Sequence, residues 1–363
     1  MKATCTTSDL RAAVAFCQKA AARNASIPVL AHALVKADGD ALTIHTADLD
    51  VWATATAPAT AEVAGVALVP VADLSAFLRV APTYSVVALS EVTGGLSIDC
   101  GSCSIILPIR DAAEFPLTMK PVETQQIDPD VFCGSLDAVQ AAMSTDTTRY
   151  FLCGVYLDGD RMVATDGVRI HEAHCPCPAK TLIHARHVPL VSRLLAGGGR
   201  FGSDGSKWTA EADDKTLVGR CIEGAYPDYR KLIETPDVVN ARQVGIVDRD
   251  AAIVAVNQAT IGDARGVRVE GAGEHIVIST VGSMSGNLAG KFQSQGSASC
   301  SAEVLSDFVG HVSGRSVIDA LNAMPDAGVA MFRRDSDPQM LIFRPADSSA
   351  FQDRRAIIVE FLA

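Results

Sequence analysis

Apolar and polar positions follow one pattern three times along the chain. Residues 33–50, 154–169 and 266–283 each contain two short stretches in which apolar and polar residues alternate, separated by a turn with glycine. Alternation with a period of two is typical of strands, and a short glycine-containing turn between two such strands predicts a β-hairpin. The copies are about a domain's length apart, so they indicate repeated domains and not a short solenoid repeat.

Helical patterns flank each predicted hairpin. A helix-like spacing of apolar residues follows the hairpins at Val69, Leu74, Phe77 and Ala81, at Ile183, Val188, Val191 and Leu195, and at Val312, Val317, Ala320 and Met324. Three further helical windows precede the hairpins, and their predicted N-caps are Ser8, Ser135 and Asp248. The repeated order of helix, hairpin, further strands and helix predicts an α+β fold.

We place the domain boundaries near residues 120 and 240, which gives three domains in residues 1–120, 121–240 and 241–363. The first boundary falls in a polar, proline-containing segment that reads MKPVETQQIDPDV, and the second follows YRKLIETPDVVNAR. Three equivalent domains favour a curved or closed assembly over an enzyme with one deep pocket. Chance similarity of three strand-rich segments is the alternative.

Charge is distributed unevenly over this chain of 363 residues. The formal net charge of −11 argues against a protein that coats nucleic acid with its whole surface. Two of the helical windows are basic, unlike the chain as a whole. Residues 8–23 contain Arg11, Lys19 and Arg23, and residues 186–200 contain three arginines and no acid. A surface shared by these helices would contact phosphates without reading sequence, although an ordinary solvated helix face is the alternative.

The chain also contains a group of potential metal ligands, namely His171, His174, Cys175 and Cys177. This group raises the alternative of a zinc or thiol-dependent enzyme. Its spacing fits none of the common zinc motifs, and on a strand the two histidines would point to opposite faces. We therefore interpret the segment as a strand that leads into a loop, with no metal, no cofactor and no catalytic residue, and Asp166 upstream as a turn former.

Residues 102–109, SCSIILPI, form an apolar run that predicts an exposed edge strand. A head-to-tail contact with an edge of the third domain, around Ile261 and residues 266–271, would cover it. The predicted interface residues are Ile105, Ile106, Leu107 and Ile261. A strand buried within its own sheet is the alternative. No stretch approaches the roughly 20 apolar residues of a membrane helix, and the first residues lack a hydrophobic block, so we expect a cytoplasmic protein.

Several motifs together carry a resemblance to a known family. They are SIPVLAHALV from Ser26, TADLDV from Thr46, EFPL from Glu114, RYFLCGVYLDG from Arg149, MVATDGVRI from Met162, YPDYRKLI from Tyr226 and SVIDALNAM from Ser316. With these motifs the chain resembles the bacterial DNA polymerase III beta subunit, the sliding clamp, over essentially its full length. A DNA-binding regulator is less compatible, because the predicted helices are rich in alanine and poor in base-reading residues.

The resemblance implies a head-to-tail homodimer that closes into a ring around double-stranded DNA, with helices inside and antiparallel sheets outside. Such a clamp is a non-catalytic processivity factor that tethers a polymerase. The implied partners are DNA, a second copy of the chain, the DNA polymerase III catalytic subunit, a clamp loader and other proteins with a clamp-binding motif.

The resemblance also assigns residues. The partner-peptide cleft would be formed by Leu152, Thr165, Gly167, Val168, Arg169, Ile170, Pro227, Lys231, Leu232, Ile357, Ile358, Val359 and Glu360. The positions that match the family's DNA contacts are Arg23, Asn24, Tyr150, Phe151 and Arg186, and from the basic helical windows we add Lys19 and Arg193 as candidate DNA-binding residues. Val168, Lys231 and Glu360 depart from the family, which often has His, Arg and Pro there. We therefore predict a cleft with an altered peptide preference.

Overall fold

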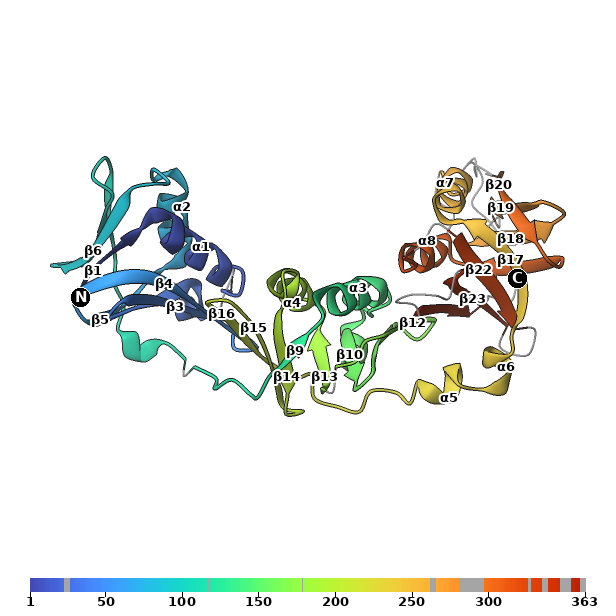
Figure 1. Cartoon of the computed structure of the whole chain (residues 1–363), viewed down its shortest axis with the longest axis horizontal. Coiled ribbons are helices and arrows are strands. Elements are labelled where there is room, and N and C mark those ends of the chain that lie inside the picture. Colours follow the sequence, from blue (N-terminus) through green and yellow to red (C-terminus); the bar gives the residue numbers. More distant parts are fainter. Residues whose placement is uncertain are drawn as a thin grey trace, which may run out of the picture. The chain divides into compact units, whose positions relative to one another are not determined.

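The computed structural model describes residues 1–22, 27–116, 118–177, 179–261, 266–280, 297–325, 328–334, 339–346 and 354–359. The chain forms two compact units, drawn in Figure 1. Unit 1 contains residues 1–129 and 186–221, and unit 2 contains residues 130–185 and 222–363. The predicted middle domain, residues 121–240, therefore contributes to both units, and the division into three domains stays a prediction.

Unit 1 is built on one antiparallel sheet of 12 described strands. The sheet contains β1 (Lys2–Thr6), β2 (His32–Asp38), β3 (Ala41–Ala47), β4 (Val51–Val63), β5 (Gly65–Pro70), β6 (Val86–Val92), β7 (Gly95–Asp99), β8 (Ser104–Leu107), β9 (Gln125–Ile127), β14 (Gly199–Ser203), β15 (Lys207–Ala212) and β16 (Lys215–Arg220). Its main path runs β8-β7-β6-β1-β4-β16-β15-β14-β9. The helices are α1 (Thr7–Cys17), α2 (Val71–Val80) and α4 (Val188–Leu195), with 3-10 turns η1 (Pro28–Ala31) and η2 (Ala112–Glu114).

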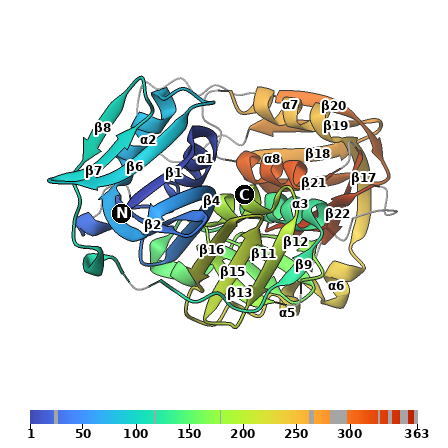
Figure 2. The same cartoon turned by 60° about the vertical axis from the view of Figure 1, so that its left-hand side comes forward.

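Unit 2 repeats this construction with a second antiparallel sheet. Its strands are β10 (Gly154–Asp158), β11 (Arg161–Thr165), β12 (Arg169–His174), β13 (Lys180–His184), β17 (Arg242–Asp248), β18 (Val267–Ala272), β19 (His275–Thr280), β20 (Ser297–Val304), β21 (Phe308–Val312), β22 (Gly328–Arg334), β23 (Met340–Pro345) and β24 (Arg354–Val359). Their order is β13-β10-β11-β12-β24-β23-β22-β17-β20-β19-β18-β21. The helices are α3 (Pro129–Gln140), α5 (Arg230–Ile233), α6 (Pro236–Val239), α7 (Arg249–Ala259) and α8 (Gly314–Asn322), with the 3-10 turn η3 (Thr147–Leu152). Figure 2 shows α7 and α8 packed side by side.

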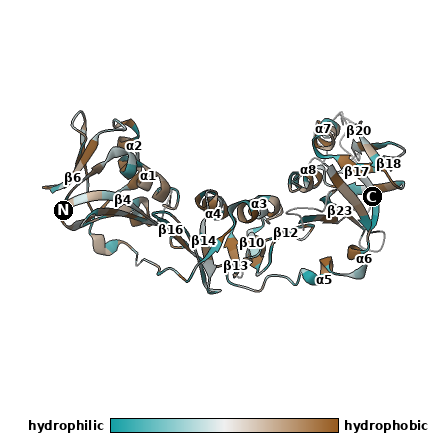
Figure 3. Ribbon diagram, viewed as in Figure 1, coloured by the Kyte–Doolittle hydropathy of each residue, from teal (hydrophilic) through white to brown (hydrophobic). Residues whose placement is uncertain are grey.

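The three predicted hairpins are confirmed as β2–β3, β10–β11 and β18–β19. Each turn contains a glycine at positive φ, where a side chain would be strained, namely Gly39, Gly159 and Gly273. The predicted helices that follow the hairpins are also confirmed, as α2, α4 and α8. Figure 3 shows hydrophobic and hydrophilic residues mixed along the helices and strands, as expected of half-buried elements.

The helix starts differ from two of the three predictions. Thr6, and not Ser8, caps α1, because its side chain accepts a hydrogen bond from the Asp9 amide at 3.2 Å. Ser135 lies inside α3, where its hydroxyl donates to the His174 carbonyl oxygen at 3.1 Å. Asp248 caps α7 as predicted. Several residues near each helix start can serve as a cap, so sequence alone did not select among them.

The edges of the sheets confirm one expectation and correct another. Strand β8 ends the sheet of unit 1, so the apolar run is an edge strand, with Ile106 60% exposed and Leu107 buried. The predicted edge at residues 266–271 is wrong, because β18 pairs with β19 on one side and with β21 on the other. The strand that ends this side of the sheet is β21. Within the described residues, no helix has the length and apolar character needed to span a membrane.

Candidate functional site

Two segments that lie far apart in the sequence become neighbouring strands in unit 2. Strand β12 pairs with the C-terminal strand β24, so that Arg169 lies opposite Ile358, and Ile170 lies opposite Ile357. The buried Glu172 of β12 forms an ion pair with Arg355 of β24, which further joins these two strands, and another with Arg161 of the neighbouring β11 at 3.6 Å. The structure thus brings together the ATDGVRI motif and the C-terminal segment, which the sequence assigned to one cleft.

The YPDYRKLI segment joins the same assembly through a hydrophobic cluster. Tyr229 and Ile233 are buried with Ile170 and Ile357, and Tyr226 packs against them. Ile170 and Ile357 therefore support the surface from below and do not line it. Among the predicted cleft residues, Thr165 and Arg169 are half-buried. The buried ones are Leu152, Ile170, Ile357 and Ile358, and the exposed set consists of Gly167, Val168, Pro227, Lys231 and Leu232.

The exposed set offers apolar contact area with little free charge. Val168 is 45% exposed and Leu232 is 36% exposed. The Lys231 ammonium lies 2.9 Å from the Asp228 carboxylate, and such an exposed ion pair contributes little to stability. Val359 pairs with Met340 in the sheet, whereas Glu360 lies outside the described residues. An apolar surface with few polar groups suits an extended peptide with hydrophobic side chains.

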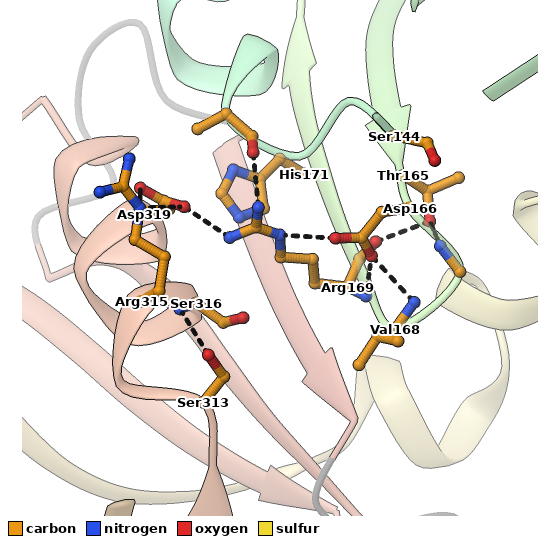
Figure 4. Close-up of polar contacts among 12 residues, drawn as sticks. Ser144, Thr165, Asp166, Val168, Arg169, His171, Ser313, Arg315, Ser316 and Asp319 are labelled. Carbon is orange, nitrogen blue, oxygen red and sulfur yellow. Dashed lines mark hydrogen bonds and ion pairs between the residues drawn. The ribbon is translucent and has the colours of Figure 1, made fainter. Parts of the chain in front are cut away.

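The turn that carries Val168 is held by side-chain hydrogen bonds, which Figure 4 shows. One Asp166 carboxylate oxygen accepts from the Val168 amide at 3.0 Å and from the Arg169 amide at 3.1 Å. The Thr165 hydroxyl donates to the Arg169 carbonyl at 2.6 Å and accepts from the Gly167 amide at 3.1 Å. Gly167 has φ of 93°, which favours glycine at this position. The prediction that Asp166 forms a turn is confirmed.

The Arg169 side chain points inward and connects three segments of unit 2 (Figure 4). Its guanidinium donates to Asp166 at 3.1 Å, to Asp319 of α8 at 2.6 Å and to the Ala141 carbonyl at 2.7 Å. The side chain is only 12% exposed. Arg169 was predicted to line the cleft, yet these contacts use its donors to position the turn and α8. Asp319 lies in the SVIDALNAM motif, but nothing in the sequence indicates that it pairs with Arg169, 150 residues away.

A second polar group lies beneath the YPDYRKLI segment. One Asp158 oxygen accepts from the Tyr229 hydroxyl at 3.0 Å and from Arg230 at 3.1 Å. Burial alone would raise the pKa of Asp158, but hydrogen bonds from Arg230, Tyr229 and Lys180 lower it. Asp158 is therefore ionised and holds the YPDYRKLI segment in place through Tyr229 and Arg230. A carboxylate whose pKa is lowered does not suit the role of a general acid.

The candidate zinc ligands separate as the strand periodicity predicts. His171 is buried and its Nδ1 lies 3.1 Å from the Ala138 carbonyl oxygen, whereas His174 is exposed at the end of β12. Burial lowers the pKa of His171 to about 4. Among the residues that the structure describes, no three His, Cys, Asp or Glu side chains are grouped so that they could hold a metal ion.

The candidate DNA-binding residues fall into both units, and Arg23 and Asn24 lie outside the described residues. In unit 2, Tyr150 is 53% exposed and meets the Phe151 ring edge to face. In unit 1, Arg186 forms ion pairs with Asp50 and, at 3.9 Å, with Asp48, so acids compensate its charge.

Lys19 and Arg193 differ from Arg186. Neither side chain makes a hydrogen bond or ion pair within the described part of the chain, and both are exposed and line one pocket of unit 1 together with Lys215. Sequence reasoning missed Lys215, because it lies in a strand and not in one of the basic helical windows.

Comparison with known proteins agrees with this geometry. Residues 1–120 match the family model of the DNA polymerase III beta subunit, N-terminal domain. The beta sliding clamp of Caulobacter vibrioides is 28% identical over 254 residues, which cover 64% of this chain and 68% of that protein. The structure also matches two solved structures, each over the whole of both chains and with a TM-score of 0.87. One is a DNA polymerase sliding clamp from Caulobacter crescentus, at 22% identity. The other is a sliding clamp from Bartonella birtlesii bound to griselimycin, at 20% identity.

The fold is thus that of the sliding clamps, a class of DNA polymerase accessory proteins. Together the comparisons indicate a divergent DNA polymerase III beta sliding clamp. Proteins of this family are non-catalytic processivity factors, and the zinc or thiol-dependent enzyme has no support.

Proposed function

We propose that the protein works in the cytoplasm as a ring-shaped homodimer that encircles double-stranded DNA and holds the DNA polymerase III catalytic subunit on it. The observation that carries this proposal is the pairing of β12 with β24 over the hydrophobic cluster. Val168, Pro227 and Leu232 are exposed on the segments that this cluster joins, and we propose that they form an apolar surface for a short linear peptide. The clamp loader and other proteins with a clamp-binding motif would use the same surface.

The edges of the two sheets support the head-to-tail dimer. Among the described strands, β8 and β21 each end a sheet and have a row of backbone groups that no described strand pairs. A contact between β8 of one protomer and β21 of its partner would convert both edges into one continuous ladder. Ile106 and Ile261 are exposed and available for this interface, whereas Leu107 is buried within unit 1.

The mass in solution tests the dimer. We expect twice 38.0 kDa at micromolar concentration. Ile106→Glu should shift the mass toward the monomer, because a carboxylate would be buried between the protomers. Val63→Glu is the matched control, since Val63 is a comparably exposed apolar residue of unit 1, and it should leave the dimer intact. A monomeric wild-type protein would contradict the proposal.

Retention on DNA tests the ring. With a clamp loader and ATP, the protein should stay on nicked circular DNA and leave once the circle is cut, because a closed ring can slide off only at an end. Equal retention on circular and linear DNA would contradict encirclement.

The peptide preference is tested separately. A fluorescent peptide with the consensus clamp-binding motif should bind more tightly to Glu360→Gln than to the wild type, because the resemblance assigns this carboxylate to the cleft and the change removes its charge. Full-strength binding that does not depend on Glu360 would overturn the altered preference and leave the proposed function in place.

A further inference from the structure

Two cysteines face each other where strand β7 turns into strand β8. The turn reads CGSC from Cys100, and the pairing of Asp99 with Ser104 on either side of it places Cys100 opposite Cys103. The Cys100 amide donates to the Cys103 carbonyl oxygen at 2.9 Å. Gly101 has φ of 81°, and its amide donates to the Asp99 carboxylate at 2.6 Å. These contacts hold the backbone of the turn in one conformation.

The backbone places the two thiols within reach of a disulfide. Opposed residues that a hydrogen bond joins across an antiparallel pair have Cα atoms about 5.5 Å apart. A disulfide joins Cα atoms that are about 4.4–6.8 Å apart. Cys100 and Cys103, both free thiols, can therefore be joined without a rearrangement of the strands. Closure also costs little chain entropy, because the turn is already ordered.

The two thiols differ in exposure. Cys103 is half-buried between two exposed serines, whereas Cys100 is only 6% exposed. Burial, and after it the neighbouring Cys103 thiol, raise the pKa of Cys100. Because the thiolate is the nucleophile, a reagent from solution meets Cys103 first, and Cys100 reacts with a sulfur that is already beside it.

Neighbouring cysteines do not have this combination of reach and access. Cys5 pairs with Val87 of β6, and β6 lies between β1 and β7. Two strand spacings separate Cys5 from Cys100 by about 10 Å, which no disulfide spans. Burial raises the pKa of Cys5 to about 12, so its thiol stays protonated at neutral pH. Cys175 and Cys177 are close in sequence, but both are buried.

We propose that Cys100 and Cys103 form a redox-sensitive modification site, which a low-molecular-weight disulfide such as oxidised glutathione closes into an intramolecular disulfide. The Cys103 thiolate attacks one glutathione sulfur, the S–S bond of glutathione breaks, and one glutathione leaves as a thiolate. The Cys100 sulfur then attacks the Cys103 sulfur, which breaks the mixed disulfide and releases the second glutathione. The two cysteines are oxidised, the glutathione disulfide is reduced, and the two thiol protons end on the released glutathiones.

The disulfide would fasten the edge strand of unit 1. Strand β8 begins directly after Cys103, is four residues long and pairs with β7 alone among the described strands. A covalent link at its first end restricts its separation from β7. In a reducing compartment such a link is transient, so the modification would be reversible. The inference goes beyond the proposed function and does not depend on it.

Mass mapping of the full-length protein tests the site. The protein is incubated with oxidised glutathione, its remaining thiols are alkylated in denaturant, and it is cut with trypsin. The tryptic peptide of residues 80–110 contains Cys100, Cys103 and no other cysteine. We expect this peptide to escape alkylation and to lose both thiol hydrogens, with Cys5 alkylated, and dithiothreitol should reverse the change. Alkylation of both cysteines, or a lasting glutathione adduct on Cys103, would overturn the inference.

Single variants test the order of the two steps. Cys100→Ser should stop at a glutathione adduct on Cys103, because the second thiol is missing, and Cys103→Ser should leave Cys100 unmodified. The reverse pattern would overturn the assigned roles. Cys221→Ser is the matched control, since it removes a half-buried thiol of the same unit, and it should close the disulfide as the wild type does. Loss of closure in this control would count against the pair.

Two further measurements follow the thiols and the strand. Brief alkylation of the folded protein should modify Cys103 at least about tenfold faster than Cys5, whose raised pKa leaves little thiolate. Equal rates would overturn Cys103 as the attacking thiol. Hydrogen exchange in residues 104–107 should slow when the wild type is oxidised, and not when Cys103→Ser is treated in the same way. Unchanged exchange in the oxidised wild type would show that the disulfide does not fasten β8.

Discussion

Arg169 in unit 2 and Arg193 in unit 1 carry the same guanidinium group in opposite surroundings. Arg169 is largely buried and donates to two carboxylates and a backbone carbonyl. Arg193 is exposed, has no partner within the described residues and lies near another cation. A buried charge is tolerated only when it is paired, so the contacts of Arg169 are structural. The free donors of Arg193 are available to a ligand, and we expect the two residues to respond to mutation in opposite ways.

The largest effect is expected at Asp319, the acidic partner of Arg169 on α8. Asp319→Ala should lower the free energy of unfolding by about 3–5 kcal/mol, because it leaves a buried guanidinium short of a partner. Hydrogen exchange followed by mass spectrometry should show faster exchange in β12, which reports on unit 2 directly. Asp319→Ala should also weaken peptide binding, because Asp319 holds Arg169 and Arg169 is part of the turn that carries Val168.

Arg315→Gln is the matched control for this change. Arg315 pairs with the same Asp319 carboxylate but is strongly exposed, so its loss should cost less than about 1 kcal/mol. If Asp319→Ala and Arg315→Gln had equally small effects, Arg169 would not depend on its buried partner, and the contrast with Arg193 would disappear.

The next effect is a loss of stability in acid, which arises from His171 beside this network. Burial holds the pKa of His171 near 4, below its value of 6.5 in an unfolded chain. Between these values the unfolded state binds more protons, so stability falls as the pH falls from about 6.5 to about 4. The contribution is on the order of 3 kcal/mol. Unfolding by denaturant across this range should show a weaker pH dependence in His171→Asn.

His174→Asn separates this effect from a general loss of histidine. His174 lies on the same strand but is exposed. The His174→Asn variant should therefore show the same dependence of unfolding free energy on pH as the wild type. If this dependence were reduced equally in both variants, burial of His171 would not be its cause.

The periodic pattern and motifs predicted much of this architecture, because local alternation and glycine turns define the three hairpins. The resemblance also assigned residues 165–170 and 357–359 to one site, and the structure pairs the strands β12 and β24 that contain most of them. The role of Arg169 could not be predicted in this way, since its partner Asp319 is distant in sequence and nothing local to either residue marks the pair. For the same reason, β18 could be identified as a strand but not as an inner one.

A smaller effect is expected on the exposed surface above the Arg169 network. Leu232→Ala should weaken binding of a clamp-binding peptide about tenfold, because Leu232 supplies apolar area at the surface and little to the core. Stability should change by less than about 1 kcal/mol. Fluorescence anisotropy measures the affinity. Val239→Ala, an exposed apolar position on α6, is the control and should bind normally. Equal weakening in both variants would place the peptide elsewhere.

The smallest effect on stability is expected at Arg193, where the comparison with Arg169 is sharpest. Arg193→Gln should change the free energy of unfolding by less than about 0.5 kcal/mol, since it breaks no described ion pair. Trp52 and Trp208 both belong to unit 1, so their fluorescence reports on this unit. The substitution should also raise the pKa of Lys19 toward its ordinary value, because the Arg193 charge is one cause of its lowering. An NMR titration of the Lys19 ammonium that showed no rise, or a large loss of stability, would mean that Arg193 is held by the protein and is not free for DNA.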